Sequence, residues 1–187
     1  KVGHVHYTAW CDDEGKLLDD GTLFRRAASH FMLCCQERHL PWLLDSAIGY
    51  DVAVSEISEE IAALSLQGPC SYSVLKAAGF EKAAALKPFQ MADFKFGKSG
   101  TLTISRTGFT GDLGYELWME PAYQRKIYEG IKAAGEEFGI VDFGMRALLS
   151  MRLEKNFPTW FRELRPIYGP FEGGMDRWVK MSKNDFI

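Results

Sequence analysis

The stretch "SRTGFTGDLGYEL" (residues 105–117) decides the fold, because it joins two short strand-like runs through a glycine-rich loop. Residues 101–106 before the loop and 115–119 after it are β-branched and aromatic, which is typical of strands. Glycines at 108, 111 and 114 permit positive φ and a close backbone approach by a ligand. Their spacing matches neither GxGxxG nor the GK[ST] loop, so the sequence gives no sign of a nucleotide site.

Outward from this loop, strand-like runs alternate with helical patterns along the whole chain, which indicates a mixed α/β (α+β) fold with largely antiparallel sheets and packed helices. The expected strands are residues 3–9, 22–26, 29–35, 51–57, 61–66, 91–96, 101–106 and 115–119. The expected helices are residues 36–49, 70–78, 121–138 and 143–154. A turn at residues 97–100 is expected to close a hairpin, and the chain after residue 156 reads as irregular. We find no repeat or low-complexity linker, which predicts one compact unit.

Composition and charge exclude several classes of protein. The 187 residues are 47% hydrophobic and 25% charged, with a net charge of −3, as in an ordinary globular protein. This charge gives no reason to expect nucleic acid or an anionic membrane as partner. No apolar run has the length of a membrane span. The four cysteines form no CxxC motif, which favours reduced thiols and a cytoplasmic protein, or a matrix protein if the source has mitochondria.

The run "CDDEGKLLDD" (residues 11–20) holds five carboxylates, and three interpretations compete for it. A calcium loop needs a glycine sixth, and counting back from Gly15 or Gly21 places Trp10 or Lys16 at the first ligand position, which excludes it. Residues 12–15 are expected to form a solvated turn. Asp19 and Asp20 lead into a strand beside apolar residues, where a carboxylate is partly buried and its pKa is perturbed.

Three further features bear on chemistry. Glu116 follows the glycine loop in a strand, and its carboxylate has the geometry to accept two hydrogen bonds from a planar amino heterocycle, or it simply points to solvent. Arginines of "FGMRALLSMRLEK" (residues 143–155) are commonly solvated or paired with acids. His4 and His6 share a strand face, but such a pair alone does not predict a metal site, so no metal is expected.

Five motifs in order resemble the tetrahydrofolate-dependent aminomethyltransferase family. That family includes the T protein of the glycine cleavage system and the folate-binding halves of dimethylglycine and sarcosine dehydrogenases. The motifs are "DEGKLLDD", "LSLQGP", "SRTGFTGDLGYEL", "MRLEK" and "GPFEGGM…KNDFI", which span nearly the whole chain. The closing segment is most similar to the dehydrogenase branch. The resemblance implies one folate-binding domain at residues 1–187, lacking an N-terminal segment and a C-terminal barrel.

The resemblance also implies roles for particular residues. Asp20 matches the catalytic carboxylate, and Glu116 matches the glutamate that binds the pterin ring of tetrahydrofolate. Tyr115 and Phe109 are expected to supply apolar walls. The glycine-cleavage enzymes carry a folate-contacting arginine where this chain has Leu148, and Arg146 is the expected substitute.

The implied activity is transfer of an aminomethyl or methyl unit from an amine to tetrahydrofolate. The implied donors are an aminomethyl-lipoyl carrier protein or a methylated amine such as dimethylglycine or sarcosine, with a flavin oxidoreductase domain as a further partner. Three alternatives stay open: a folate-dependent S- or O-demethylase, a folate-binding protein without transferase activity, and a structural domain with remnant motifs. The "KGCYxGQ" signature of the non-transferase branch is replaced here by "KNFPTW" (residues 155–160), which argues for the enzyme.

Overall fold

The computed structural model describes residues 1–97 and 100–184, and the chain divides into two compact units. Unit 1 consists of Lys1–Val5 and Ile57–Phe157, and unit 2 consists of His6–Glu56 and Pro158–Ile187. Each unit closes a hydrophobic cluster of its own. The sequence predicted one compact unit, and it gave no sign of the division because no linker separates the two clusters. The assignment of residues 1–187 to a single folate-binding domain stays a prediction.

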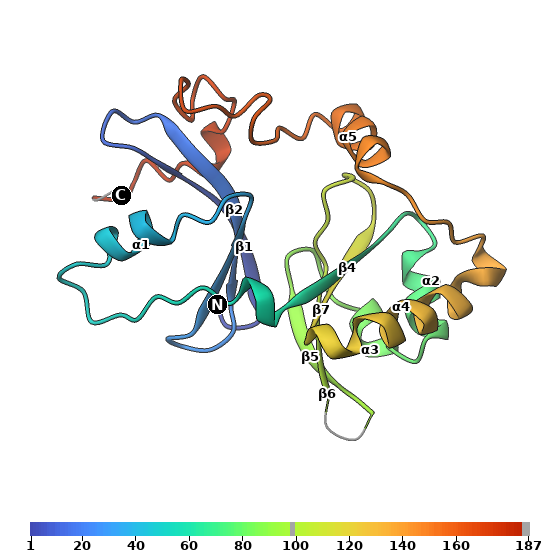
Figure 1. Cartoon of the computed structure of the whole chain (residues 1–187). Coiled ribbons are helices and arrows are strands. Elements are labelled where there is room, and N and C mark those ends of the chain that lie inside the picture. Colours follow the sequence, from blue (N-terminus) through green and yellow to red (C-terminus); the bar gives the residue numbers. More distant parts are fainter. Residues whose placement is uncertain (98–99, 185–187) are drawn as a thin grey trace. The chain divides into compact units, whose positions relative to one another are not determined.

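Unit 1 is built on a four-stranded antiparallel sheet in the order β4-β7-β6-β5, with helices packed against it (Figure 1). Its strands are β4 (Ala62–Gln67), β5 (Met91–Phe96), β6 (Gly100–Ser105) and β7 (Gly114–Met119). Its helical segments are η1 (Ser58–Glu60), α2 (Ser71–Ala77), α3 (Glu81–Ala84), α4 (Pro121–Gly135), η2 (Glu136–Phe138) and α5 (Met145–Glu154). Since β7 is an inner strand, its residues Glu116, Leu117 and Trp118 have strand partners on both sides.

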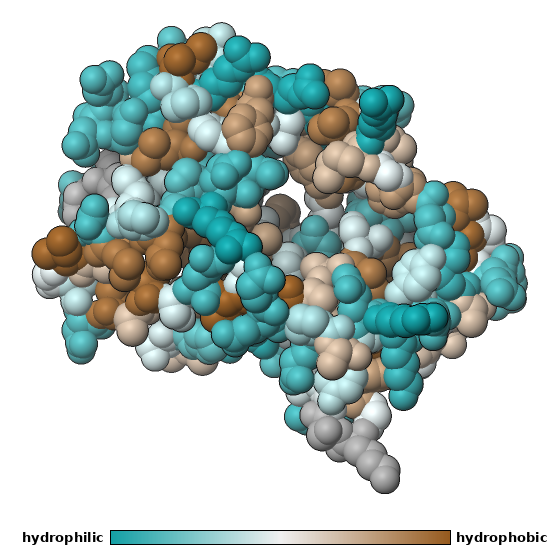
Figure 2. Space-filling view, in the orientation of Figure 1, coloured by the Kyte–Doolittle hydropathy of each residue, from teal (hydrophilic) through white to brown (hydrophobic). Residues whose placement is uncertain are grey.

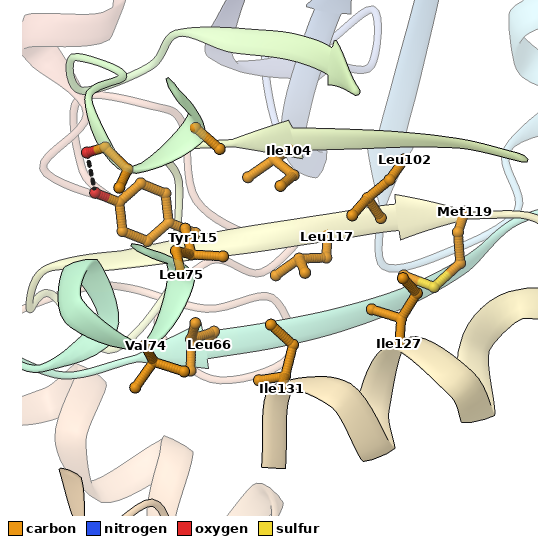
Figure 3. Close-up of a cluster of buried hydrophobic side chains, with 12 residues drawn as sticks. Leu66, Val74, Leu75, Leu102, Ile104, Tyr115, Leu117, Met119, Ile127 and Ile131 are labelled. Atoms are coloured by element: carbon orange, nitrogen blue, oxygen red, sulfur yellow. Dashed lines mark hydrogen bonds between the residues drawn. The ribbon is translucent and has the colours of Figure 1, made fainter. Parts of the chain in front are cut away.

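The core of unit 1 lies between this sheet and helices α2, α3 and α4 (Figure 3). Tyr115, Leu117 and Met119 alternate along β7 and are all buried in this cluster. Successive side chains of a strand point to opposite faces, so Glu116 and Trp118 lie on the other face of the sheet. Each buried leucine or isoleucine of the cluster contributes about 1.5–3 kcal/mol to folding. The core therefore fixes which face of β7 is left for polar chemistry.

Unit 2 holds a three-stranded sheet in the order β1-β2-β3. Its elements are β1 (His4–Cys11, which begins in unit 1), β2 (Leu17–Arg25), β3 (Phe31–Cys35), α1 (Leu40–Ser46) and η3 (Asp176–Trp178). A small cluster of Leu17, Leu164 and Met175 packs on β1 and β2, and Leu17 N donates to Tyr168 O at 2.9 Å. The irregular C-terminal segment thus supplies the residues that cover this sheet.

Apolar side chains also stay on the surface of unit 2. Leu44, Ile48, Tyr50 and Val52, on α1 and the segment after it, are exposed. Brown residues are visible over this part of unit 2 in the space-filling view (Figure 2).

The structure confirms the mixed α/β class with antiparallel sheets. Seven of the eight expected strands coincide with observed ones to within a few residues, as do the four expected helices. The strand expected at residues 51–57 is wrong: this segment is irregular and mostly exposed, and it belongs to neither sheet of the described residues. The turn at residues 97–100 and the motif "KNDFI" lie partly outside the described residues. No helix in the described part of the chain has the length and apolar character needed to span a membrane.

Candidate functional site

The acidic run separates into a turn and a strand. Asp12 Oδ1 accepts hydrogen bonds from Glu14 N (3.0 Å) and Lys16 N (2.8 Å), and Gly15 has φ +75°. An aspartate that bonds the backbone two and four residues on stabilises such a turn without any ligand. The solvated turn is therefore confirmed, and β2 begins directly after it at Leu17. Asp19 and Asp20 lie within this strand rather than at its entrance.

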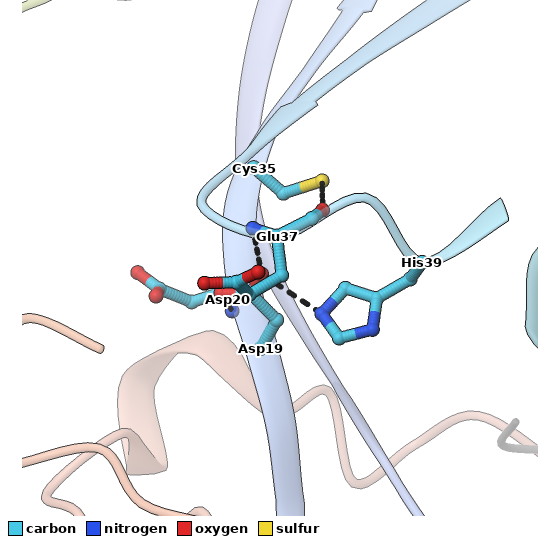
Figure 4. A network of polar contacts seen from close by, with 5 residues as sticks. All are labelled: Asp19, Asp20, Cys35, Glu37 and His39. Atoms are coloured by element: carbon cyan, nitrogen blue, oxygen red, sulfur yellow. Dashed lines mark hydrogen bonds and ion pairs between the residues drawn. The ribbon is translucent and has the colours of Figure 1, made fainter. Parts of the chain in front are cut away.

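Asp19 is buried and fully engaged by the protein (Figure 4). Its Oδ1 accepts from Asp20 N at 2.7 Å, and its Oδ2 accepts from Glu37 N at 3.0 Å and lies 3.0 Å from His39 Nε2. Three donors satisfy a carboxylate that burial would otherwise make costly. Asp19 thus ties β2 to the segment after β3 and holds the backbone of Asp20.

Asp20 points to a different partner and is only partly buried. The hydroxyl of Tyr7, on β1, donates to Asp20 Oδ2 at 2.6 Å. Burial raises the pKa of Asp20; the Tyr7 hydrogen bond opposes this, and the negative charge of Asp19 adds to it. Burial and the charge of Asp20 also raise the pKa of Tyr7, which keeps its hydroxyl protonated as the donor. The result is a carboxylate that takes up a proton more readily than a solvated aspartate does.

Glu116 occupies the polar face of the sheet in unit 1. Its neighbours across the strands are Ser65 on β4 and Ser105 on β6. Thr107 Oγ1 donates to Glu116 Oε2 at 2.5 Å. Burial raises the pKa of Glu116, and the Thr107 hydrogen bond opposes that rise. The alternative interpretation, a glutamate that simply points into solvent, does not describe this side chain, because it is partly buried and hydrogen-bonded to Thr107.

The glycine loop before β7 is packed around the side chain of Gln67, the last residue of β4. Gln67 Nε2 donates to Tyr115 O (3.2 Å) and Thr107 O (3.4 Å), and Gln67 Oε1 accepts from Thr110 Oγ1 (3.2 Å). A Cβ added at Gly108 or Gly114 would lie 2.1 or 1.9 Å from Gln67 Oε1. These two glycines are therefore needed for the loop to close over the amide, which fixes the start of β7 where Glu116 sits.

Phe109, at the middle of the loop, is partly buried, and its ring lies 6.2 Å from that of Phe157. Lys155 follows α5, and its aliphatic stem lies against Gly111, where a Cβ would come within 2.3 Å of it. The loop thus rests on the end of the "MRLEK" helix. The expectation that Phe109 forms an apolar wall stays a prediction.

Tyr115 and Arg146 lie in surroundings that differ from those expected. Tyr115 is fully buried in the core, and its hydroxyl donates to Ala84 O at 2.7 Å (Figure 3). Strand alternation directs it away from the face that carries Glu116, so its expected part as a wall of the ligand site has no support in the structure. Arg146, in the first turn of α5, is exposed, and no described residue pairs with it. Its contact with a ligand stays a prediction.

Sequence reasoning missed Tyr7, His39, Thr107 and Gln67. Tyr7, His39 and Gln67 lie far in the sequence from the groups that they contact. Thr107 and Glu116 lie on opposite sides of the glycine loop. Glu116, Tyr115, Phe109 and Arg146 belong to unit 1 and Asp20 belongs to unit 2. No group of three or more His, Cys, Asp or Glu side chains among the described residues is placed to hold a metal ion.

Comparison with known proteins gives a consistent picture. The family model described as the GCVT N-terminal domain matches residues 1–183. An aminomethyltransferase of Lysinibacillus sphaericus is 31% identical over 190 residues, covering 100% of this chain and 52% of that protein. An aminomethyltransferase of Bacillus licheniformis is 33% identical over 192 residues, again covering 100% and 52%. The chain spans about half the length of these curated relatives.

Among solved structures, the glycine cleavage system aminomethyltransferase T of Bartonella henselae is similar, with a TM-score of 0.81 at 25% sequence identity. The match covers 97% of this chain and 48% of that one. The relatives and this structure thus match nearly the whole chain, in both units.

Proposed function

Because the chain belongs to the GCVT N-terminal domain family, we propose that it is the folate-binding part of an enzyme that transfers an aminomethyl or methyl unit from an amine to tetrahydrofolate. Residues 1–187 act in this proposal as one folate-binding domain. The curated relatives named aminomethyltransferase support the reaction class. The chain spans about half of their length, so the activity of the whole protein rests on this proposal.

The main support for this proposal is that Asp20 is partly buried and has a raised pKa. One-carbon transfer to a folate nitrogen requires a group that removes the proton of that nitrogen and faces a developing iminium cation. A partly buried carboxylate with a raised pKa suits both tasks, because it is a better base than a solvated aspartate and its charge acts at low dielectric. Tyr7 and Asp19 fix its position from either side. In this reaction Asp20 is the catalytic base and the electrostatic partner of the cation.

Glu116 supports folate as the acceptor. A pterin ring presents an amino group and a ring N–H side by side, and a carboxylate accepts both in a bidentate manner. Glu116 is partly buried and held by Thr107, so it loses little freedom when a ligand binds. We assign it to the pterin ring, with Phe109 as an apolar wall and Arg146 as a contact to the ligand's acidic end.

For the donor, we propose an aminomethyl group on a lipoyl carrier protein. The aminomethyltransferases of the comparison support this choice. The second candidate is a methylated amine such as dimethylglycine or sarcosine, favoured by the closing segment "RLEKNFPTWFRELRPIYGPFEGGM" (residues 152–175). That route needs a flavin oxidoreductase to convert the amine to an iminium before transfer.

The test has two parts. Tetrahydrofolate is titrated calorimetrically into the protein, its Glu116→Ala variant and a Glu120→Ala control, which removes an exposed glutamate just after β7. The proposal expects Glu116→Ala to weaken binding by roughly 1.5–3 kcal/mol and the control to bind normally. Absence of binding by the unmodified protein would refute the proposal.

Transfer is then measured with the unmodified protein and with Asp20→Asn, supplied in turn with aminomethyl-lipoyl carrier protein and with methylated amines together with a flavin oxidoreductase that oxidises them to the iminium. We expect folate affinity within a few fold of the original and loss of product formation. Full activity of Asp20→Asn would exclude it as the catalytic residue. The donor that yields methylene-tetrahydrofolate with the unmodified protein decides between the two routes.

A further inference from the structure

We propose that Thr107 is a positioning residue, the last donor of a one-directional hydrogen-bond chain that runs from Trp118 to Ser105 to Thr107 to Glu116. This chain holds the Glu116 carboxylate as an acceptor for the paired N–H donors of a planar amino heterocycle. The inference deepens the proposed function and rests on it for the identity of the ligand. The hydrogen-bond chain itself rests on the geometry of unit 1 alone.

The register of the sheet brings the four side chains together. Ser105 on β6 lies directly opposite Glu116 on β7, and Trp118 is the next residue of β7 on the same face. Trp118 Nε1 donates to Ser105 Oγ at 3.1 Å, Ser105 Oγ lies 2.7 Å from Thr107 Oγ1, and Thr107 Oγ1 lies 2.5 Å from Glu116 Oε2. Ser105 is fully buried and Thr107 nearly so. Solvent therefore does not compete for these two hydroxyl groups.

The hydrogen-bond chain has a direction because its last member, an ionised carboxylate, can only accept. Thr107 therefore donates its one hydrogen to Glu116. The hydrogen between Ser105 and Thr107 must then come from Ser105. Trp118 Nε1, which can only donate, supplies the first hydrogen of the chain to Ser105 Oγ.

The hydrogen bond from Thr107 is stronger to an ionised Glu116 than to a protonated one. A carboxyl group that carries its proton on Oε1 still accepts from Thr107 at Oε2, but its neutral carbonyl oxygen is a weaker acceptor than a carboxylate oxygen. The hydrogen-bond chain therefore favours the ionised carboxylate and opposes burial, which raises the pKa of Glu116.

The chain also leaves the carboxylate with capacity to bind. It uses one lone pair of Oε2, and no described residue donates a hydrogen bond to Oε1. A carboxylate accepts about four hydrogen bonds, so both oxygens still have room for a donor each. Two adjacent N–H groups of a flat heterocycle match that spacing, which is the ligand chemistry that this site would recognise.

The experiment follows the carboxyl carbon of Glu116 by NMR as pH is varied, in protein without ligand. Its signal is identified by its absence from the spectrum of Glu116→Gln. Thr107→Val removes the hydroxyl with little change of shape, and Thr107→Ser restores a donor. Thr101→Val removes a hydroxyl from the same face of β6, one that accepts a hydrogen bond from Lys95 rather than contacting Glu116. We expect the pH at the midpoint of the Glu116 titration to rise in Thr107→Val. This midpoint should stay unchanged in Thr107→Ser and Thr101→Val.

Tetrahydrofolate affinity is then measured at pH 7 for the same variants. We expect it to fall roughly tenfold in Thr107→Val and to recover in Thr107→Ser, since a charge-assisted hydrogen bond is lost and restored. An unchanged midpoint in Thr107→Val would overturn the hydrogen-bond chain whatever the affinity. A raised midpoint in a protein that never binds tetrahydrofolate would support the chain and refute the proposed function.

Thermal unfolding by circular dichroism shows whether Thr107→Val folds. Should it fail, Ser105→Ala breaks the chain one link earlier and leaves Thr107 in place. The midpoint of Glu116 is then expected to rise by a smaller amount. No rise in that variant would likewise overturn the inference.

Discussion

His39 Nε2 lies 3.0 Å from Oδ2 of Asp19, a carboxylate that is 1% exposed. The same carboxylate accepts the backbone N–H groups of Asp20 and Glu37. His39 also meets the ring of Trp10 edge to face, at 5.7 Å between ring centres. Asp19 thus joins β2 to the segment after β3, His39 joins that segment to Trp10 of β1, and the proposed catalytic residue directly follows Asp19 in the sequence.

Replacing Asp19 by alanine should destabilise the protein by about 3–5 kcal/mol. The change leaves two backbone donors and an imidazole without the buried acceptor that they share, and removing one partner of a buried polar group costs far more than a lost surface contact. Urea unfolding followed by fluorescence measures the effect. Asp13→Ala, at an exposed position in the same acidic run, should stay within about 0.5 kcal/mol of the original. Equal effects of the two substitutions would contradict the structural part given to Asp19.

Asp20 should make stability depend on pH in an unusual direction. Its pKa in the folded protein lies above its ordinary value, so the fold favours the protonated form. The stability that Asp20 contributes is complete below the ordinary pKa and is lost as pH rises through the raised folded value. At pH 7 the ionised Asp20 therefore destabilises the folded protein.

Asp20→Asn should consequently be more stable than the original protein at pH 7 and about equally stable near pH 3. Its amide oxygen still accepts the hydrogen bond from Tyr7. Thermal unfolding across this range measures the difference, with Asp13→Asn as a control for the loss of one surface charge. An asparagine variant that is less stable at pH 7 would show that the ionised carboxylate stabilises the fold.

The sequence predicted the two central carboxylates but little of what surrounds them. Tyr115 was expected as a wall of the ligand site beside Glu116, but strand alternation puts the two on opposite faces, and a local pattern does not say which face the helices cover. The Tyr7–Asp20 hydrogen bond spans 13 residues and depends on how β1 lies beside β2. His39 stands in no motif at all, because only the folding of the segment after β3 brings it to Asp19. Contacts of this kind come from tertiary structure and leave no periodic signal.

A side chain at Gly21, in β2, should destabilise the protein. A Cβ there would lie 2.4 Å from the carbonyl oxygen of Cys34, which is backbone of the paired strand β3 and has little room to move. Gly21→Ala should cost about 1–3 kcal/mol in urea unfolding. Gly130→Ala is the matched control, since that helical position in α4 has nothing within 4 Å and should gain about 0.5–1 kcal/mol. A neutral Gly21→Ala would mean that β2 and β3 separate more easily than their register indicates.

Gln67 should hold the glycine loop in place for Glu116. Gln67→Ala removes the amide that bonds Tyr115 O, Thr107 O and Thr110 Oγ1, and it leaves a gap over Gly108 and Gly114. We expect amide hydrogens of residues 106–113 to exchange faster, and tetrahydrofolate to bind less tightly, because Glu116 and Thr107 are no longer fixed relative to each other. The loss of stability should be about 1–2 kcal/mol.

Gln124→Ala supplies the control for the Gln67 variant, because it also removes an amide that donates to a backbone carbonyl, that of Ala63, but on the exposed surface of α4. Hydrogen exchange measured by mass spectrometry should leave residues 106–113 protected in that variant. Loop protection that survives in Gln67→Ala would show that the glycines alone set the loop. In that case Thr107 would owe its position to Ser105 and the strand, and the amide of Gln67 would merely fill space.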